Sequence, residues 1–174
     1  MKNLLNFMQS TVHQINVGTG GVPKNPVEII RVMRNGLEGD RHNYWGHGGR
    51  SKAICLYSVE CLAVLKGLGF TVFPGALGEN FTTEGIEYHD VCIGDTYKVG
   101  EVVQIRITDI REPCGTIRRA YSPDAKRGEG IQAAMWNAEV KKRNPNAEKW
   151  GMTGFYAEVL TEGVVHRGDL MKKV

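Results

Sequence analysis

The chain has 174 residues, of which 41% are hydrophobic and 24% charged, and its formal net charge is +3. This size and balance fit one globular domain whose core needs no disulfide or structural metal. The small net charge gives no support for nucleic-acid binding, and no apolar stretch approaches the length of a membrane span. Four cysteines without a CxxC pair, and an apolar run at Leu4–Met8 too short for a signal peptide, lead us to expect a cytoplasmic, reduced protein. Three of the thiols are expected to be buried in the core: Cys55, Cys61 and Cys92.

The first half of the chain predicts short strands separated by glycine-rich loops. We expect strands at Thr11–Val17, Val27–Met33 and Ala53–Tyr57. The loop between the second and third of these is long enough to carry function. Ser58 is expected to cap a helix that runs from Val59 to about Lys66.

The second half continues with strands and one helical interruption. Further strands are expected at Phe81–Thr83, Val91–Ile93, Thr96–Val99, Val102–Thr108, Gly154–Leu160, Val164–Arg167 and Leu170–Val174. Residues 131–143 carry apolar side chains near helical spacing, so a helical excursion at about 122–149 is expected over one mouth of the strands. The elements together imply a mainly β fold, a closed or nearly closed mixed β-barrel with two or three peripheral helices. Residues 1–10 are expected to be an N-terminal extension and residues 11–174 a single domain.

The segment Asp109–Arg119 contains the strongest candidate for chemistry. Pro113 is expected to end the preceding strand, and Cys114 and Gly115 to form a tight exit turn. Three arginines lie within five residues of the sulfur: Arg111, Arg118 and Arg119. A thiol in a partly open, electropositive turn is expected to ionise below its usual pKa and to act as a nucleophile or metal ligand. The alternative is that Cys114 is a small buried apolar residue and the arginines form a solvated face.

Two glycine-rich stretches upstream carry residue types that bind anions. Arg41, His47, Arg50 and Lys52 supply cationic donors, and the glycines between them let the backbone approach a ligand closely. This combination suits a phosphate or another oxyanion, whereas the alternative is a surface loop with solvated charges. His42 and His47 are also candidates for a divalent metal, although their spacing matches no specific metal motif.

The loop before residue 81 offers a carboxylate and an amide, Glu79 and Asn80. The amide of Asn80 can pair with the edge of a heterocycle through one donor and one acceptor. Alternatively, both side chains satisfy backbone groups of their own loop. Trp45 is a candidate to stack on a ligand, whereas Trp136 and Trp150 are expected to pack the helical excursion.

Five motifs follow one another along the chain. They are Gly-Leu-Glu-Gly-Asp-Arg-His (36–42), His-Gly-Gly-Arg-Ser-Lys-Ala (47–53), Pro-Gly-Ala-Leu-Gly-Glu-Asn-Phe-Thr-Thr-Glu-Gly-Ile (74–86), Val-Cys-Ile-Gly-Asp (91–95) and Arg-Glu-Pro-Cys (111–114). Together they strongly resemble the MOSC domain, named for the C-terminal domain of molybdenum cofactor sulfurases. The resemblance extends over about residues 11 to 174. The chain looks like a small stand-alone bacterial member, without the aminotransferase-like or ferredoxin domains of larger relatives.

The resemblance implies a mostly β fold similar to the β-barrel domain of pyruvate kinase. It also implies a cysteine that carries sulfur as a persulfide or ligates molybdenum in a pterin cofactor. Cys114 matches that cysteine, and a soft thiolate suits both tasks. The residues that would hold the anionic pterin cofactor, on matched motif positions, are Arg41, His47, Lys52, Asn80 and Arg111. Two departures bear on substrate specificity: Gly115 stands where many stand-alone relatives have a bulky aromatic residue, and residues 122–149 form the helical excursion.

Within this class two functions stay open. An oxidoreductase would keep the cofactor bound, work with a redox partner and reduce, for example, N-hydroxylated substrates. A sulfur carrier would accept sulfur from a cysteine desulfurase, so pyridoxal phosphate would enter only through that partner. The anion-binding loops favour cofactor binding, because a bare sulfur carrier has no evident use for them.

Two functions outside this class are also open. The first is a non-catalytic barrel that binds the pterin cofactor or delivers it to a partner. The second is a divalent-metal hydrolase that uses His42 and His47, and it needs a carboxylate that the sequence does not place beside them.

Overall fold

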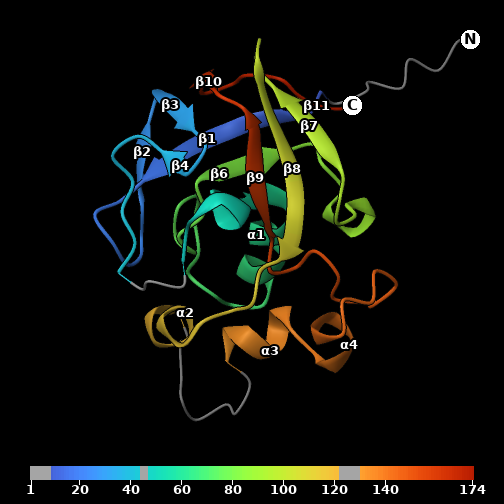
Figure 1. Cartoon of the computed structure of the whole chain (residues 1–174). Helices are drawn as coiled ribbons and strands as arrows, with labels where there is room; N and C mark the ends of the chain where they lie inside the picture. Colours follow the sequence, from blue (N-terminus) through green and yellow to red (C-terminus); the bar gives the residue numbers. More distant parts are fainter. Residues whose placement is uncertain (1–8, 44–46, 122–129) are drawn as a thin grey trace, which may run out of the picture.

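A computed structural model of the chain describes residues 9–43, 47–121 and 130–174, with the side chains of residues 118–120 left out. Most strands belong to one strongly bent eight-stranded sheet (Figure 1). Its strands, in sheet order, are β11 (Met171–Lys173), β7 (Thr96–Val99), β8 (Val103–Ile110), β9 (Phe155–Thr161), β5 (Ile54–Ser58), β6 (Phe81–Glu84), β1 (Thr11–Val17) and β2 (Asn25–Val27). Neighbouring strands are antiparallel, except for the parallel pair β5 and β6.

A small second sheet lies beside the large one. It has the order β10 (Gly163–His166), β3 (Ile29–Met33) and β4 (Gly36–Leu37). Single residues connect two of its strands to the large sheet: Glu28 lies between β2 and β3, and Glu162 lies between β9 and β10. The described structure is therefore mainly β, as the sequence predicts.

The expected closed barrel is not confirmed. The order of the large sheet is linear, and its outermost strands, β11 and β2, form no ladder with each other in the described part of the chain. The sheet bends far enough for the start of β1 to reach the start of β11, where Thr11 and Leu170 form a single bridge. The N–H of Met171 also donates to the carbonyl of Ser10 at 2.8 Å. These contacts tie the start of β1 to the start of β11 without a continuous strand pairing.

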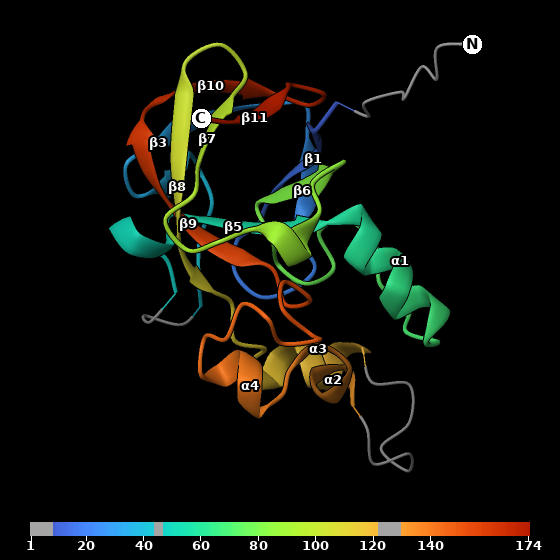
Figure 2. The ribbon, with the colours of Figure 1, turned by 90° about the vertical axis from the view of Figure 1, so that its right-hand side faces the viewer.

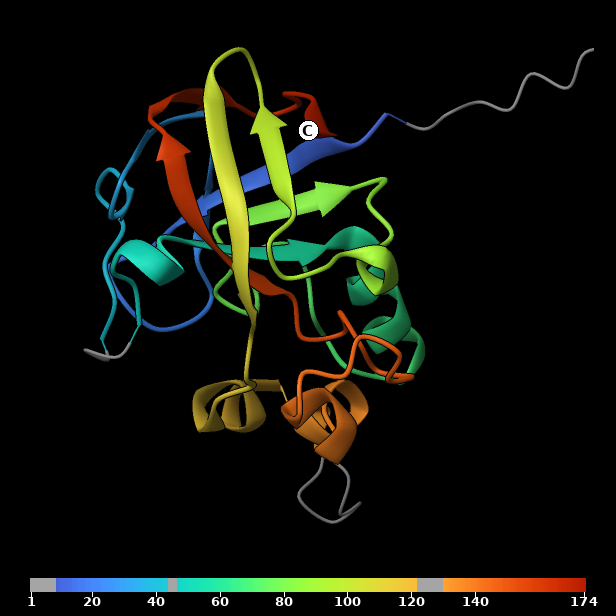
Figure 3. The same cartoon turned by 45° about the vertical axis from the view of Figure 1, so that its right-hand side comes forward.

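The helices gather at one end and along one side of the strands (Figures 2 and 3). Helix α1 (Val59–Gly67) flanks the sheet after β5, and α2 (Gly115–Tyr121), α3 (Ile131–Met135) and α4 (Ala138–Lys141) lie together below the end of β8. Two 3-10 turns, Arg50–Lys52 and Tyr88–Asp90, complete the helical structure. Within the described residues, no helix has both the length and the apolar character needed to cross a bilayer.

The core lies between the bent sheet and these helices. All five residues of β5 are buried because this strand is central, with β9 and β6 on its two sides. Trp150 packs edge-on against Phe155 at 5.8 Å between ring centroids, and its indole N–H donates to the carbonyl of Val91 at 2.8 Å. The hydroxyl of Tyr57 donates to the carbonyl of Met152 at 2.7 Å. These buried polar bonds attach the segment after α4 to the sheet, and they agree with the expectation that Trp150 packs this segment.

Within residues 131–143 the expected helical excursion consists of two short helices, α3 and α4, rather than one continuous helical run. Helix α3 ends at Met135, Trp136 is extended, and Asn137 caps a new helix by accepting from the N–H of Val140 at 3.0 Å. An asparagine side chain that satisfies a free N–H group favours a helix start over a helix interior. The apolar spacing alone could not show this break.

Three other local expectations need correction. Residues 91–93 lead from a 3-10 helix into a turn at residues 93–94 and form no strand, and Cys92 is exposed rather than a core thiol. Gly115 begins helix α2 instead of completing a tight turn after Cys114. The second expected strand is split at Glu28 into β2 and β3, which belong to different sheets.

The cap of α1 provides a stability prediction. The hydroxyl of Ser58, which is fully buried, accepts from the N–H of Cys61 at 3.0 Å. Loss of such a cap typically costs about 1 kcal/mol, so Ser58→Ala is expected to lower the free energy of unfolding by about that amount. Urea denaturation measures the change, and Ser51→Ala, at an exposed serine, is the matched control. Equal stability of both variants would contradict the capping role.

Candidate functional site

Three adjoining cavities meet around Cys114 and His47. We call the first, of about 140 Å³, the inner cavity; its lining includes Lys24, Arg41, His42, His47, Arg111 and Cys114. The second, of about 360 Å³, is the outer cavity, lined by His47, Lys52, Asp109, Ile110, Glu112, Pro113, Cys114, Arg143 and Tyr156. A connecting cavity of about 40 Å³ lies between them and includes Lys52, Asn80 and Arg111 in its walls. Cys114 faces both larger cavities, and His47 faces all three.

Cys114 is held at the junction of a strand and a helix. It is half-buried, follows the end of β8 by four residues and immediately precedes α2. The side-chain amide of Gln132, from α3, donates to the carbonyl of Pro113 at 3.1 Å and fixes the backbone next to the sulfur. The placement agrees with a partly open thiol rather than a fully buried apolar residue.

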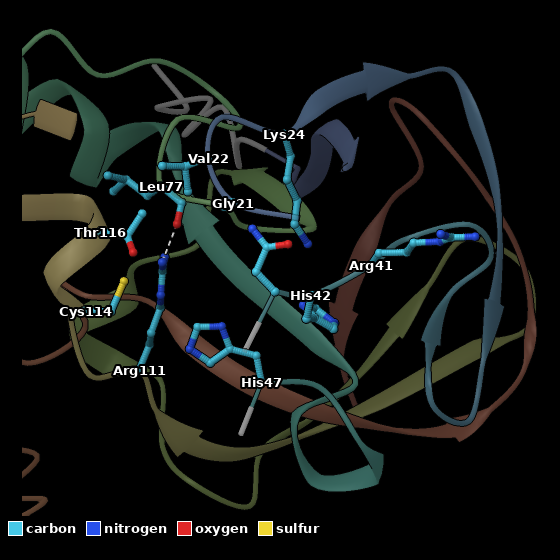
Figure 4. A pocket seen from close by; sticks show the side chains of 12 residues that line it. Gly21, Val22, Lys24, Arg41, His42, His47, Leu77, Arg111, Cys114 and Thr116 are labelled. Carbon is cyan, nitrogen blue, oxygen red and sulfur yellow. Dashed lines mark hydrogen bonds between the residues drawn. The ribbon is translucent and has the colours of Figure 1, made fainter. Parts of the chain in front are cut away.

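Arg111 forms one wall of the inner cavity beside Cys114 (Figure 4). Only 8% of the residue is exposed, and its guanidinium donates to the carbonyl of Leu77. Its own N–H donates to the carbonyl of Gly154 at 3.0 Å, which anchors the end of β8 against β9. A guanidinium has five N–H donors, so this buried cation can bind an anion in the cavity as well as Leu77.

A buried ion pair forms the opposite wall. The ammonium of Lys24 lies 2.6 Å from Oδ2 of Asp40, and both side chains are at most 4% exposed. Asp40 also accepts from the N–H of Gly18 at 2.9 Å and from the amide of Asn80 at 2.8 Å. Asp40 is fixed by its bonds to Gly18, Lys24 and Asn80. It therefore holds the ammonium of Lys24 in a fixed position at the inner cavity.

The amide of Asn80 is used within the protein. Its oxygen accepts from the N–H of Cys55 at 3.0 Å, its nitrogen donates to Asp40, and the residue is 1% exposed. This arrangement matches the alternative in which Asn80 satisfies protein groups. Asn80 therefore positions Asp40, and through it Lys24, at the edge of the connecting cavity.

Glu79 shapes the loop that carries Leu77 and Gly78. Its carboxylate is fully buried and accepts from the N–H groups of Gly75 and Leu77 at 2.6 and 3.2 Å. Gly75 has a φ of +90°, and a Cβ there would lie 2.5 Å from the carbonyl oxygen of Lys24. The loop can approach Lys24 this closely only because residue 75 is glycine.

The two histidines of the site lie edge to face. Their ring centroids are 6.4 Å apart at 90°, and a Cβ at Gly48 would lie 2.8 Å from the nearest atom of the His42 ring. Burial lowers the pKa of His47, and the nearby charge of Arg111 lowers it further. Burial and the charge of Lys24 likewise lower the pKa of His42. Both rings are therefore mainly neutral at pH 7 and can take up a proton when an anion arrives.

Lys52 and Tyr156 line the outer and connecting cavities together. The ammonium of Lys52 lies 5.1 Å from the centroid of the Tyr156 ring, within the range of a cation–π contact. Burial raises the pKa of Tyr156 to about 12. Its hydroxyl therefore stays protonated and can donate a hydrogen bond.

Of the residues predicted for the site, the structure brings all six to these cavities, although not in equal roles. Cys114, Arg111, His47 and Lys52 face cavity space near one another, whereas Asn80 is used by protein partners. Arg41 lines the inner cavity, but its side chain points away from Cys114 (Figure 4). Trp45 and the side chains of Arg118 and Arg119 lie outside the described residues. The residues that the sequence analysis missed are Lys24, Asp40, Arg143 and Tyr156.

The thiol of Cys55 also lines the connecting cavity, but it differs from Cys114 in burial. Cys55 is buried, and burial raises its pKa, so it stays protonated. A protonated thiol is a poor metal ligand and nucleophile.

Within the described residues, no three His, Cys, Asp or Glu side chains gather to bind a metal ion, so the hydrolase with His42 and His47 has no ligand set there.

The lowered histidine pKa values predict a pH-dependent anion affinity. An anion in the inner cavity stabilises protonated His47 and raises its pKa, so binding takes up a proton between the free and bound pKa values. Sulfate, which does not titrate in this range, is therefore expected to bind more tightly as the pH falls from 7.5 to 5.5, by at most about tenfold per pH unit for one linked proton. Calorimetry in buffers of different ionisation enthalpy measures the proton uptake. His47→Gln is expected to reduce this pH dependence, and an unchanged dependence would contradict the assignment.

These features define a mainly β domain that places a half-buried thiol beside a cavity with two buried cations. The MOSC domain family model matches residues 43–172, and the chain belongs to this family. MOSC domains are generally linked to molybdenum cofactor binding and sulfur handling.

The chain is similar to several known proteins over different shares of its length. It is 30% identical to the uncharacterized protein YflK of Bacillus subtilis over 85% of this chain and 60% of YflK. It is 33% identical over 62% of its length to a protein named reductase from Gibberella moniliformis, covering 20% of that protein. The crystal structure of YiiM from Geobacillus stearothermophilus superposes with a TM-score of 0.63 and 27% identity, over 95% of this chain and 75% of YiiM. The chain thus spans less than two thirds of the length of YflK and of the Gibberella reductase.

Proposed function

We propose that the chain binds a molybdenum-pterin cofactor, with the cofactor's anionic part in the inner cavity and Cys114 as a ligand of molybdenum. One observation carries this proposal: a half-buried thiol shares a single cavity with two buried cations, Lys24 and Arg111. Buried cations favour an anion, and a thiolate is a soft ligand suited to a soft metal centre. Membership of the MOSC family supports the same assignment.

The donor set suits the cofactor's phosphate and metal better than its whole pterin. Ligand pockets usually measure about 300 Å³ or more, whereas the inner cavity measures about 140 Å³. The inner cavity therefore accommodates only part of the cofactor, and the rest would extend along its open side. Arg111 and Lys24 would hold the anionic group, and His47 would stand between that group and the outer cavity.

When bound, the molybdenum centre supplies two-electron redox chemistry. The residues of the chain would bind the cofactor and orient it. Arg111 and Lys24 neutralise negative charge, and His47 can take up a proton that offsets the anion's charge. The protonated hydroxyl of Tyr156 can donate to a molecule in the outer cavity. In this function the chain is an oxidoreductase that works with a redox partner.

A sulfur carrier is the second function that the geometry supports, since Cys114 also opens to the outer cavity. The Cys114 thiolate would attack the terminal sulfur of a persulfide on a cysteine desulfurase. A new S–S bond forms on Cys114, the old S–S bond breaks, and the desulfurase leaves with its cysteine thiolate, so no net oxidation occurs. Pyridoxal phosphate would act only in that partner.

Analysis of wild-type protein from a molybdenum-competent host tests the proposal. Bound molybdenum with a pterin in the released small molecules is the result expected for the cofactor-binding function. An intact mass increased by one sulfur atom, without molybdenum, would favour the carrier. Zinc in place of molybdenum would contradict both.

A non-catalytic protein that delivers the cofactor predicts a different dependence on the thiol. In that case pterin binds with little dependence on Cys114, because affinity comes from the cationic walls alone. Titration of wild type and Cys114→Ser with the isolated cofactor distinguishes this function from the first.

A further inference from the structure

We propose that the outer cavity is a second subsite at Cys114, which takes a small polar molecule without net charge. The inference rests on the proposed function, because it assigns the substrate side of the group held in the inner cavity. In this arrangement the inner cavity holds the anionic part of the cofactor, and the outer cavity holds the molecule that reacts with it. The proposal is supported by the volume of the outer cavity, by the charges of its lining and by the hydrogen bonds that fix Arg143 in its wall.

The outer cavity is the larger of the two and has the size of a ligand site. Its volume of about 360 Å³ lies within the range of about 300–1,000 Å³ that is common for small-molecule pockets. It shares only Cys114 and His47 with the inner cavity. A molecule in the outer cavity would therefore reach the sulfur past a lining that contains neither Arg111 nor Lys24.

The charges of the two cavities differ. The outer lining has two cations, Lys52 and Arg143, and two carboxylates, Asp109 and Glu112. These balance, whereas the inner cavity is lined by three cationic side chains, of which only Lys24 is paired with a carboxylate among the described residues, that of Asp40. Arg41 and Arg111 therefore leave the inner lining with a net positive charge. A balanced set of donors and acceptors favours a neutral or zwitterionic molecule with N–H or O–H groups, and gives an anion no advantage.

Arg143 binds both Asp109 and Glu112 in the wall of the outer cavity, and we call these three residues the clamp. Nε and Nη2 of Arg143 each lie 3.0 Å from one carboxylate oxygen of Asp109, and Nη1 and Nη2 each lie 3.2 Å from Oε1 of Glu112. Arg143 has a φ of +60°, which is uncommon for a residue other than glycine. Its backbone N–H donates to the carbonyl of Val140, and its guanidinium also donates to the carbonyl of Lys141. The end of α4 thus presents Arg143 to both carboxylates.

This clamp joins the helical excursion to the segment that carries Cys114. Asp109 and Glu112 lie five and two residues before the cysteine, while Arg143 comes from the segment after α4. The excursion therefore sets the charge of the outer cavity, and Arg143 is its specificity-determining residue. Without Arg143, Asp109 and Glu112 leave the cavity with a net negative charge.

Charged thiol reagents test this subsite in protein freed of cofactor. In a Cys92→Ser background, which removes the exposed thiol, we would measure the rate at which Cys114 reacts with cationic and anionic methanethiosulfonates at low salt. Arg143→Gln is expected to raise the rate with the cationic reagent roughly threefold and to lower the rate with the anionic one, by the Coulomb energy of one charge about 6 Å away in water. Glu112→Gln, which keeps the bonds between Arg143 and Asp109, is expected to shift the rates in the opposite direction. Added salt should reduce both shifts.

Arg106→Gln is the matched control, because Arg106 also pairs with a carboxylate at the surface of β8, at 2.6 Å from Glu158, but lines none of the three cavities. It should leave the rates unchanged. Rates in Arg143→Gln and Glu112→Gln that equal those of wild type would overturn the proposal, since Cys114 would then not be reached through the outer cavity. This outcome is independent of cofactor content, so a protein without molybdenum that shows the charge shifts would overturn only the proposed function.

Discussion

Replacing Cys114 by serine is expected to lower the molybdenum content of the purified protein by at least about 10-fold. Loss of an outer-shell partner already costs roughly 10–100-fold in metal affinity, and here the ligand itself is removed. A serine hydroxyl is neutral at pH 7 and hard, so it replaces neither the charge nor the softness of a thiolate. Elemental analysis of wild type and variant from the same molybdenum-competent host measures the effect.

Cys92→Ser is the matched control for this experiment, since it removes an exposed thiol that lines none of the cavities described here. It should leave the molybdenum content unchanged. Intact mass spectrometry of the same samples reports a persulfide, which should vanish only in the Cys114 variant. Equal molybdenum and sulfur content in wild type and Cys114→Ser would rule out both the ligand and the carrier role.

Replacing Lys24 by methionine should have the largest effect on stability. The variant leaves Asp40 as a buried, uncompensated carboxylate, and loss of one partner of a buried ion pair typically costs about 3–5 kcal/mol. Sulfate binding to the inner cavity should weaken by roughly tenfold or more, because a hydrogen bond to a charged group contributes about 1.5–3 kcal/mol. Urea denaturation and calorimetry measure the two effects.

Two further variants distinguish the effect of breaking the buried ion pair from the effect of removing any positive charge. Lys98→Met removes an exposed lysine of β7 and should change the free energy of unfolding by less than about 0.5 kcal/mol. The double variant Lys24→Met with Asp40→Asn removes both charges, so it should cost less stability than the sum of the two single variants. Additive costs would show that the two residues do not act as a pair.

The local pattern of the sequence predicted the strands that have one buried face and clear ends. The limits of β1 agree with the expected strand, and α1 begins after the serine that was expected to cap it. These elements depend on residues close together in the chain, where alternation and capping decide the conformation. The split after Met135 and the exposure of Cys92 were missed, because a single asparagine cap and a turn bond to Asp95 outweigh the apolar spacing.

The sequence by itself determined that a thiol follows a strand and that cationic, glycine-rich loops precede it. Only the tertiary structure decided which of these charges meet the sulfur. Lys24 faces the inner cavity because Asp40 binds its ammonium there, and Asn80, 40 residues further along the chain, donates to Asp40 in turn. Arg143 reaches the outer cavity because the chain turns after the end of α4, where Arg143 has a φ of +60°, and because Asp109 and Glu112 bind its guanidinium. Both depend on contacts between distant residues, which a pattern of neighbouring residues does not contain.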